Sequence, residues 1–292
     1  MKKPHFFKAY SRIGLAHIPY GQKKLNIGVE QGPDAILTGK FLSQFNGALA
    51  TSFEFPKPED INKNFYHVLA DNVKKFQDVI NQNLKSSETQ VVIGGDHSIT
   101  FPSVLAVLQR ISDPKSIGYI QFDSHGDINL RAFSPTDNWH GMYVRPLVDG
   151  FDVSRIEKLV TKKLPVNNIF YIGNLDLDPG ERDFFIKYNI KNICKKELRE
   201  EKSANIKAFA KFAASFRHLH VTFDIDCIDQ SEAPATGIPA RDGLFYKDIL
   251  PLLEIINQHP SISFDLSEVN PKKRGAKETV ALAQQILRVV LS

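Results

Sequence analysis

Eight short apolar runs, separated by longer stretches with helical periodicity, are the feature of this 292-residue sequence that most limits its fold. Several runs, such as VVIGG at 91–95 and IGYIQFD at 117–123, are almost continuously apolar. A strand has this composition when helices cover both of its faces, as in a parallel sheet. The sequence therefore predicts an α/β fold in which residues 1–292 form a single domain, with a mostly parallel sheet and helices on both faces.

The positions of the predicted elements follow from the same pattern. Strands are predicted at 12–18, 48–55, 90–93, 116–123, 168–173, 190–194, 218–226 and 261–266. Helices are predicted at 59–84, 100–111, 204–216, 246–258 and 277–291. Because strands and helices alternate and no Gly-, Pro- or Ser-rich linker interrupts them, one domain is favoured over two.

Composition excludes several classes of protein. Apolar residues make up 42% and charged residues 24%, an ordinary globular balance, and 37 basic against 33 acidic residues leave a net charge of only +4. This small surplus does not indicate nucleic-acid binding, and no apolar run approaches the ~20 residues of a membrane span. Two cysteines, Cys194 and Cys227, cannot form a disulfide framework and indicate a reducing compartment. We therefore expect a cytoplasmic protein whose partner is a small molecule.

Acidic and imidazole side chains follow three of the predicted strands at the point where each strand ends. The three segments are GGDHS at 94–98, DSHGD at 123–127 and DID at 224–226. Residues two apart lie on the same side of a strand, and ligands of open α/β sheets bind beyond the carboxyl ends of the strands. We therefore expect six side chains to converge there. They are His97, Asp123, His125, Asp127, Asp224 and Asp226.

Such a cluster requires a counter-charge, because four neighbouring carboxylates raise one another's pKa values. Two divalent cations carry the charge that cancels four aspartates. Carboxylates with imidazoles and no thiolate favour Mn²⁺ over Zn²⁺. Two ions roughly 3.5–4 Å apart can share a water that becomes a nucleophile near neutral pH. Each segment alone is common in polar turns, but the three together predict a site for two Mn²⁺ per chain.

These segments, the third extended to TFDIDCID at 222–229, resemble the three signatures of the ureohydrolase family, which contains arginases and agmatinases: GGDHS, DAHxD and SFDxDxxDP. Further matches favour the arginase branch: GVEQGP at 28–33, DIN at 127–129, NWHG at 138–141, DLDPGE at 176–181, PATG at 234–237 and EVNP at 268–271. The resemblance implies a parallel eight-stranded sheet and a binuclear manganese centre in which both ions share Asp123 and Asp224. It also implies a homo-oligomer, either a trimer or a hexamer.

By the same resemblance the reaction is hydrolysis of L-arginine to L-ornithine and urea, with a metal-bridging hydroxide attacking the guanidinium carbon. Asp127 or His140 would deliver a proton to the leaving nitrogen, and Glu268 would pair with the guanidinium. The remaining substrate contacts implied are Asn129, Thr136 and Asn138 to the carboxylate, and Asp178 and Glu181 to the α-amino group. The last two residues also match a helix N-cap and its third position, and both roles can coexist.

Some residues depart from the arginase pattern. Ile238 stands where arginases carry Thr, and Gln230 stands where the family carries Pro. Asp137 replaces a Gly beside Asn138, so it would repel a substrate carboxylate unless it points outward or pairs, for instance with Arg131. Two alternatives therefore stay open. The chain could be an agmatinase or another guanidino-acid ureohydrolase, or it could be a metal-binding relative without catalysis.

Overall fold

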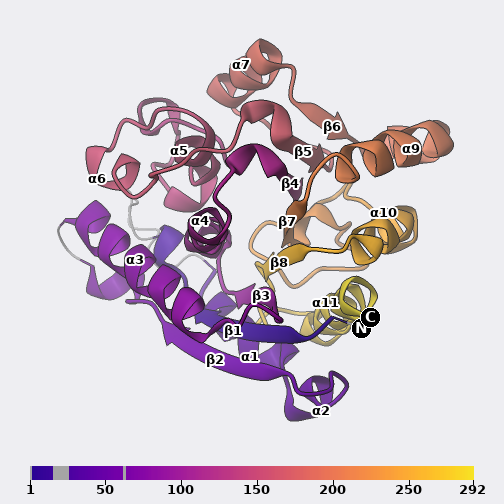
Figure 1. The fold of residues 1–292 in the computed structure, drawn as a ribbon, viewed down its shortest axis with the longest axis horizontal. Coiled ribbons are helices and arrows are strands. Elements are labelled where there is room, and N and C mark those ends of the chain that lie inside the picture. The colour runs from indigo at the N-terminus through magenta and orange to yellow at the C-terminus, as the bar shows by residue number, and fades with distance from the viewer. Residues whose placement is uncertain (1, 16–25, 62–63) are drawn as a thin grey trace.

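Eight strands pair side by side in one sheet in the computed structural model, which describes residues 2–15, 26–61 and 64–292 (Figure 1). Every pairing is parallel, and the order is β2-β1-β3-β8-β7-β4-β5-β6. The strands are β1 Pro4–Tyr10, β2 Leu49–Glu54, β3 Thr89–Gly94, β4 Ile117–Phe122, β5 Ile169–Ile172, β6 Lys191–Ile193, β7 His218–Asp224 and β8 Ile262–Ser267. The predicted parallel α/β sheet is confirmed.

This strand order places four carboxyl ends next to one another in the centre of the sheet. The last two strands, β7 and β8, return to lie between β3 and β4. Phe122 pairs with Phe223, so the residues that follow them, Asp123 and Asp224, lie level at the edge. The segments at 94–98, 123–127 and 224–226, together with Glu268, lie at the carboxyl ends of these four strands. The topology therefore brings distant parts of the sequence to one crevice.

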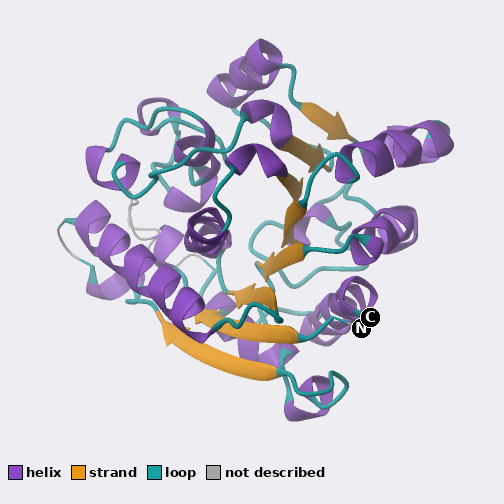
Figure 2. Cartoon of the chain, viewed as in Figure 1, coloured by secondary structure: helices purple, strands orange, loops and turns teal. Residues whose placement is uncertain are grey.

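Helices cover both faces of the sheet, as the nearly continuous apolar strands predict (Figure 2). The helices of the described residues are α1 Gly32–Ile36, α2 Gly39–Leu42, α3 Phe65–Asn83, α4 Thr100–Arg110, α5 Val144–Val148, α6 Ser154–Glu157, α7 Pro179–Tyr188, α8 Lys195–Glu200, α9 Lys202–Ala213, α10 Tyr246–Gln258 and α11 Ala276–Leu291. Within β4, Tyr119 packs into the layer formed with α3, α4 and α5, whereas Ile120 and Phe122 pack into the layer of α9, α10 and α11. None of these helices has both the length and the apolar character of a membrane span.

The first strand was predicted too late in the chain. Strand β1 spans Pro4–Tyr10, whereas residues 13–15 of the predicted run 12–18 form a 3₁₀ turn and residues 16–18 lie outside the described residues. The charged Lys8 interrupts the apolar pattern of this strand, so the sequence does not mark the strand as buried. In the structure the Lys8 ammonium group lies 2.8 Å from Asp34, and the residues on either side of Lys8 are buried. A lysine stem can cross apolar surface in this way.

The long helix predicted at 59–84 is also shorter in the structure. Its described part is a 3₁₀ turn at Pro58–Asp60, followed by α3 from Phe65 to Asn83, and residues 62–63 lie outside the described residues. Asn64 has a left-handed φ of 59°, which a continuous α-helix does not allow. The helix predicted at 246–258 is confirmed without change.

Candidate metal centre and substrate cavity

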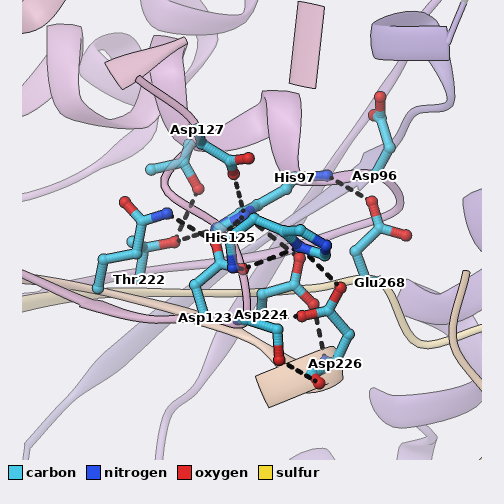
Figure 3. Close-up of polar contacts among 12 residues, drawn as sticks. Asp96, His97, Asp123, His125, Asp127, Thr222, Asp224, Asp226 and Glu268 are labelled. Atoms are coloured by element: carbon cyan, nitrogen blue, oxygen red, sulfur yellow. Dashed lines mark hydrogen bonds and ion pairs between the residues drawn. The ribbon is translucent and has the colours of Figure 1, made fainter. Parts of the chain in front are cut away.

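The deepest part of the crevice holds an inner donor group, which consists of His97, Asp123 and Asp127 (Figure 3). The Nδ1 atom of His97 lies 3.1 Å from Asp123 Oδ2 and 2.9 Å from Asp127 Oδ2. Asp224 adds a third carboxylate, with Oδ2 at 3.3 Å from the same nitrogen. All four side chains are at least nine-tenths buried. Three strands therefore direct one imidazole and three carboxylates to a single point.

An outer donor group consists of Asp123, His125 and Asp226. His125 Nδ1 lies 3.4 Å from Asp123 Oδ1 and 3.4 Å from Asp226 Oδ2. Asp123 thus belongs to both groups, one oxygen facing each imidazole, as expected for a carboxylate shared by two ions. Asp224 joins the inner group through Oδ2, while its Oδ1 accepts the backbone N–H of Asp226 at 2.8 Å.

The donor atoms fit divalent cations better than they fit one another. His97 Nδ1 is buried and has no hydrogen-bond partner, although three carboxylate oxygens surround it. A buried polar atom left unsatisfied is costly, and a cation bound between the imidazole and the carboxylates would satisfy both. Because the set contains imidazole and carboxylate and no thiolate, it suits Mn²⁺ or a similar divalent ion.

The pKa values of the donor residues also reflect the close approach of their charges. Burial, together with the charge of Asp123, raises the pKa of Asp127 to about 8. Burial and the charge of Asp226 raise the pKa of Asp224 well above its ordinary value. Burial opposes protonation of His97, but the surrounding carboxylates outweigh it and raise the pKa of that imidazole. Protons therefore neutralise the metal-free cluster, and bound cations would displace them.

Two of the site residues have a left-handed backbone. Asp127 has φ 52° and Glu268 has φ 66°, a region that costs a non-glycine residue about 1–3 kcal/mol. Hydrogen bonds hold both conformations. Asp127 O accepts the N–H of Val144 at 2.9 Å, and the N–H of Glu268 donates to Gly95 O at 2.7 Å. The surrounding structure thus over-determines the two loops, which is typical of functional sites.

Glu268 follows β8 and lies beside the inner group. Its Oε1 accepts the backbone N–H of His97 at 3.0 Å, and its Oε2 accepts Asn26 Nδ2 at 2.8 Å. Burial, with the charge of Asp96, raises the pKa of Glu268 to about 8. Asn26 in turn accepts from Asn270 Nδ2 at 2.7 Å. The sequence alone gives no signal for Asn26, because its partners are more than 240 positions away.

A cavity of about 460 Å³ opens above these groups. Its wall contains all the site residues predicted from the sequence except Asp123, which is fully buried. They are His97, His125, Asp127, Asn129, Thr136, Asn138, His140, Asp178, Glu181, Asp224, Asp226 and Glu268. The structure therefore brings the predicted metal-binding and substrate-binding residues to one place.

The N-terminus of α7 forms another part of the cavity wall. Asp178 and Glu181 form a capping box there, and Glu181 also accepts the N–H of Ile128 at 3.0 Å. Burial raises the pKa of Glu181 to about 7. Asn129 Nδ2 donates to Asp178 Oδ2 at 2.7 Å, while the Oδ1 atoms of Asn129 and Asn138 are buried without a partner. The capping role is thus observed, and the substrate contacts stay a prediction.

Asp137, the acidic residue beside Asn138, is paired and does not stand free in the cavity. Its Oδ1 accepts from Tyr66 OH at 2.9 Å, and both of its oxygens lie 3.1 Å from Arg131 Nε. Asp137 also has φ 56°, which explains why a glycine suits this position. The pairing meets the condition under which Asp137 would not repel a substrate carboxylate. Ile238 lines the cavity with 61% of its surface exposed.

His140 stands in the cavity wall with its Nδ1 buried and unpartnered. Burial and the positive charges of His125 and His97 lower the pKa of His140 to about 4. The imidazole is therefore neutral at neutral pH in the metal-free chain. It must accept a proton before it can deliver one.

Three further residues contact the donor groups, and the sequence alone assigns none of them a role. His97 Nε2 lies 2.8 Å from Thr222 Oγ1 and 3.1 Å from Tyr143 OH, and Gln121 Nε2 donates to Asp123 Oδ2 at 2.6 Å. Gln121 and Thr222 precede the acids of their strands by two positions, so strand periodicity could have identified them. Nothing in the sequence marks Tyr143.

Comparisons with known proteins identify the family to which this all-parallel α/β sheet, with its acid–imidazole cluster at the carboxyl edge, belongs. Residues 11–292 match the model of the Arginase family. An arginase of Staphylococcus aureus is 30% identical over 293 residues, which cover 92% of this chain and 95% of that protein.

Solved structures have the same fold. The crystal structure of Entamoeba histolytica arginase in complex with L-ornithine matches with a TM-score of 0.87 at 22% identity, covering 100% of this chain and 98% of that one. Bacillus subtilis arginase matches with a TM-score of 0.84 at 23% identity, covering 100% and 99%. The chain belongs to the arginase family, and so to the hydrolases that act on carbon–nitrogen bonds of linear amidines. The family predicted from the motifs is confirmed.

Proposed function

We propose that the protein is a manganese-dependent ureohydrolase that cleaves L-arginine to L-ornithine and urea. The observation that carries the proposal is a pair of donor groups sharing Asp123 beneath a cavity, with Glu268 in the wall beside them. The cavity volume of about 460 Å³ suits a small guanidino compound.

Two ions are assigned to the two donor groups. The ligands would be His97, Asp123, Asp127 and Asp224 for one ion, and Asp123, His125, Asp224 and Asp226 for the other. Divalent ions bound here would lower the pKa of water toward neutrality, which supplies the nucleophile for hydrolysis of a carbon–nitrogen bond.

Glu268 would hold the guanidinium end of the substrate. A carboxylate matches this planar cation in charge and hydrogen-bond geometry. Asn26 and the backbone N–H of His97 each contact one of its oxygens, so the carboxylate has a fixed orientation. Its pKa of about 8 in the metal-free chain would fall as cations and substrate bring positive charge nearby.

The other end of the substrate would face the α7 side of the cavity. We assign Asn129, Thr136 and Asn138 to the amino-acid carboxylate, and Asp178 and Glu181 to the α-amino group. At the reacting end, neutral His140 would accept a proton and pass it to the leaving nitrogen, with Asp127 as the second candidate for that transfer.

Agmatine, the decarboxylated analogue of arginine, is a second candidate substrate. Ile238 presents an exposed apolar side chain to the cavity, and this side chain does not discriminate between arginine and agmatine. We retain arginine because Asp137 is paired with Arg131 and Tyr66. The intact ligand set argues against a metal-binding relative without catalysis, because clustered acids are costly to keep without metal.

We further propose that residues 1–292 act as one domain within a trimer or hexamer, in a reducing cytoplasm where Cys194 and Cys227 stay free. Size and light-scattering measurements test the assembly.

The substrate is tested with a panel of L-arginine, agmatine and guanidinobutyrate after reconstitution with Mn²⁺. We expect urea from L-arginine at the highest kcat/KM. A preference for agmatine would reject the assignments of Asn129, Thr136 and Asn138. Absence of urea from every compound, with metal bound, would reject the proposed activity.

A further inference from the structure

A buried chain of hydrogen bonds connects the two residues at the centre of the inner donor group. Gln121 Nε2 donates to Asp123 Oδ2 at 2.6 Å, and Gln121 Oε1 accepts from Tyr119 OH at 2.8 Å. The Tyr119 oxygen lies 3.3 Å from Tyr143 OH, which lies 3.1 Å from His97 Nε2. The three linking side chains have no exposed surface. Because His97 Nδ1 returns to Asp123 Oδ2 at 3.1 Å, the chain closes into a ring.

Each hydrogen bond in this ring has only one possible direction. An ionised carboxylate only accepts, so Gln121 turns its NH₂ toward Asp123 and its carbonyl toward Tyr119. That carbonyl takes the single proton of Tyr119, and the Tyr119 oxygen can then only accept from Tyr143. The proton of Tyr143 is thereby used, so the Tyr143 oxygen must accept from the Nε2–H of His97.

The direction of the ring determines which tautomer His97 adopts. With Nε2 donating to Tyr143, Nδ1 is the nitrogen that faces the carboxylates of the inner group and that is left to bind the ion. A histidine ligand must offer a neutral nitrogen, and its other N–H is usually fixed by a partner that it donates to. The ring supplies this partner and also holds the oxygen of Asp123 nearest to His97.

Thr222 alone does not provide the same control. Its hydroxyl lies 2.8 Å from His97 Nε2 and 2.9 Å from the hydroxyl of Thr100. Since both threonine hydroxyls can donate or accept, that contact is compatible with either tautomer of His97. Only the ring, which ends on an acceptor-only carboxylate, removes the ambiguity.

We propose that Tyr119, Gln121 and Tyr143 are positioning residues that set the tautomer of His97 and the orientation of Asp123, so that the inner ion binds to a preformed site. This inference rests on the proposed metal centre and deepens it. The outer group has no such support. Within the described part of the chain, the His125 ring makes no hydrogen bond or ion pair other than those with Asp123 and Asp226.

The test measures Mn²⁺ affinity of the full chain by competition with a chromophoric chelator. Tyr143→Phe and Tyr119→Phe each break the ring and should weaken one of the two Mn²⁺ sites by about 10–100-fold, the usual range for a partner of a metal ligand. The second Mn²⁺ site should keep its affinity. At saturating Mn²⁺, KM for the substrate should be unchanged, because neither tyrosine lines the cavity.

Two further measurements separate positioning from general damage. Ser103→Ala removes another buried hydroxyl, which contacts Gln90 and Asp265 and no donor residue, and should leave both Mn²⁺ affinities unchanged. The double variant Tyr119→Phe/Tyr143→Phe should bind no more weakly than the worse single variant, because one break already opens the ring.

The outcomes distinguish this inference from the proposed activity. Wild-type Mn²⁺ affinity in both tyrosine variants, or losses that multiply in the double variant, would overturn the ring. If the wild type binds two Mn²⁺ but releases no urea, the activity fails while the ring is still judged by affinity.

Discussion

The inner and outer donor groups share Asp123 but differ in how the protein supports them. The side chain of His97 is 3% exposed and lies within hydrogen-bond distance of Thr222 on β7 and of Tyr143, whereas the side chain of His125 is 32% exposed and faces the cavity. The inner group is therefore organised by the chain itself. The outer group is open to water and substrate, and its geometry depends more on the ion.

This difference teaches that two ions in one site need not be equivalent. A preformed donor set loses less conformational entropy on binding than a set that must be ordered by its ligand. We therefore expect the inner ion to bind first and to exchange slowly, and the outer ion to respond to the contents of the cavity.

The largest effect is expected where the two groups meet. Asp123→Ala removes the shared carboxylate, so both ions should be lost and kcat/KM should fall by at least about 1000-fold, since bound metals supply several kcal/mol to such reactions. Metal analysis and urea assays measure this. Asp229→Asn is the control, because Asp229 lies outside both donor groups and its Oδ1 accepts the backbone N–H and the hydroxyl of Ser231. Retention of two ions by Asp123→Ala would refute the sharing.

The comparison is tested directly by removing one imidazole at a time. His125→Asn should leave one tightly held Mn²⁺ per chain. His97→Asn should weaken the binding of both ions, because it disrupts the preformed inner donor group. Either change should lower kcat by about 100-fold or more. Atomic absorption after dialysis against a weak chelator measures the difference. Equal metal retention in the two variants would show that the inner and outer donor groups are equivalent.

A smaller effect is expected at Glu268, which accepts the backbone N–H of His97 but belongs to neither donor group. Glu268→Gln should retain both ions and lower kcat/KM by about 10–100-fold, the value of a charged hydrogen bond. Steady-state kinetics with parallel metal analysis separate these quantities. Loss of an ion in this variant would mean that Glu268 belongs to the metal centre.

The smallest effect concerns stability against pH. The pKa values of Asp127 and Glu268, each about 8, and of Glu181, about 7, are raised above their ordinary values by burial, so the folded metal-free chain binds more protons than the unfolded chain. Stability should therefore fall as pH rises from 6.5 to 8. Below that window, His140 and His218, with pKa values lowered to about 4 and about 3 by burial, act in the opposite direction.

Bound Mn²⁺ should remove most of this dependence, because cations take the place of the protons. Thermal unfolding at pH 6.5 and pH 8, with EDTA or with Mn²⁺, gives the two slopes. Equal slopes in both conditions would show that the acid cluster is not coupled to metal binding.

Much of the fold and the site could be predicted because both depend on local patterns. Continuous apolar runs indicate buried parallel strands, and polar residues directly after them indicate the functional edge. Asp123 and His125 were identifiable because they follow such a run with strand spacing. Strand β1 was misplaced because Lys8 interrupts its apolar pattern, although its ammonium group reaches Asp34 outside the sheet.

Other features depend on tertiary contacts that a single sequence does not display. Tyr143 and Asn26 reach the site from loops, and only the folded chain shows their partners. The departure at Gln230 is explained in the same way, because its backbone N–H donates to Ala240 O at 2.7 Å, which a proline could not do. The exposure of Ile238 inside the cavity has no structural explanation.

The most direct measurement is a titration of the metal-stripped protein with Mn²⁺ while urea release from L-arginine is recorded. Two ions caged by the inner and outer groups predict activity that is absent without metal and reaches its plateau at two Mn²⁺ per chain. Full activity in the stripped protein, or a plateau at a single ion, would contradict a shared two-ion centre.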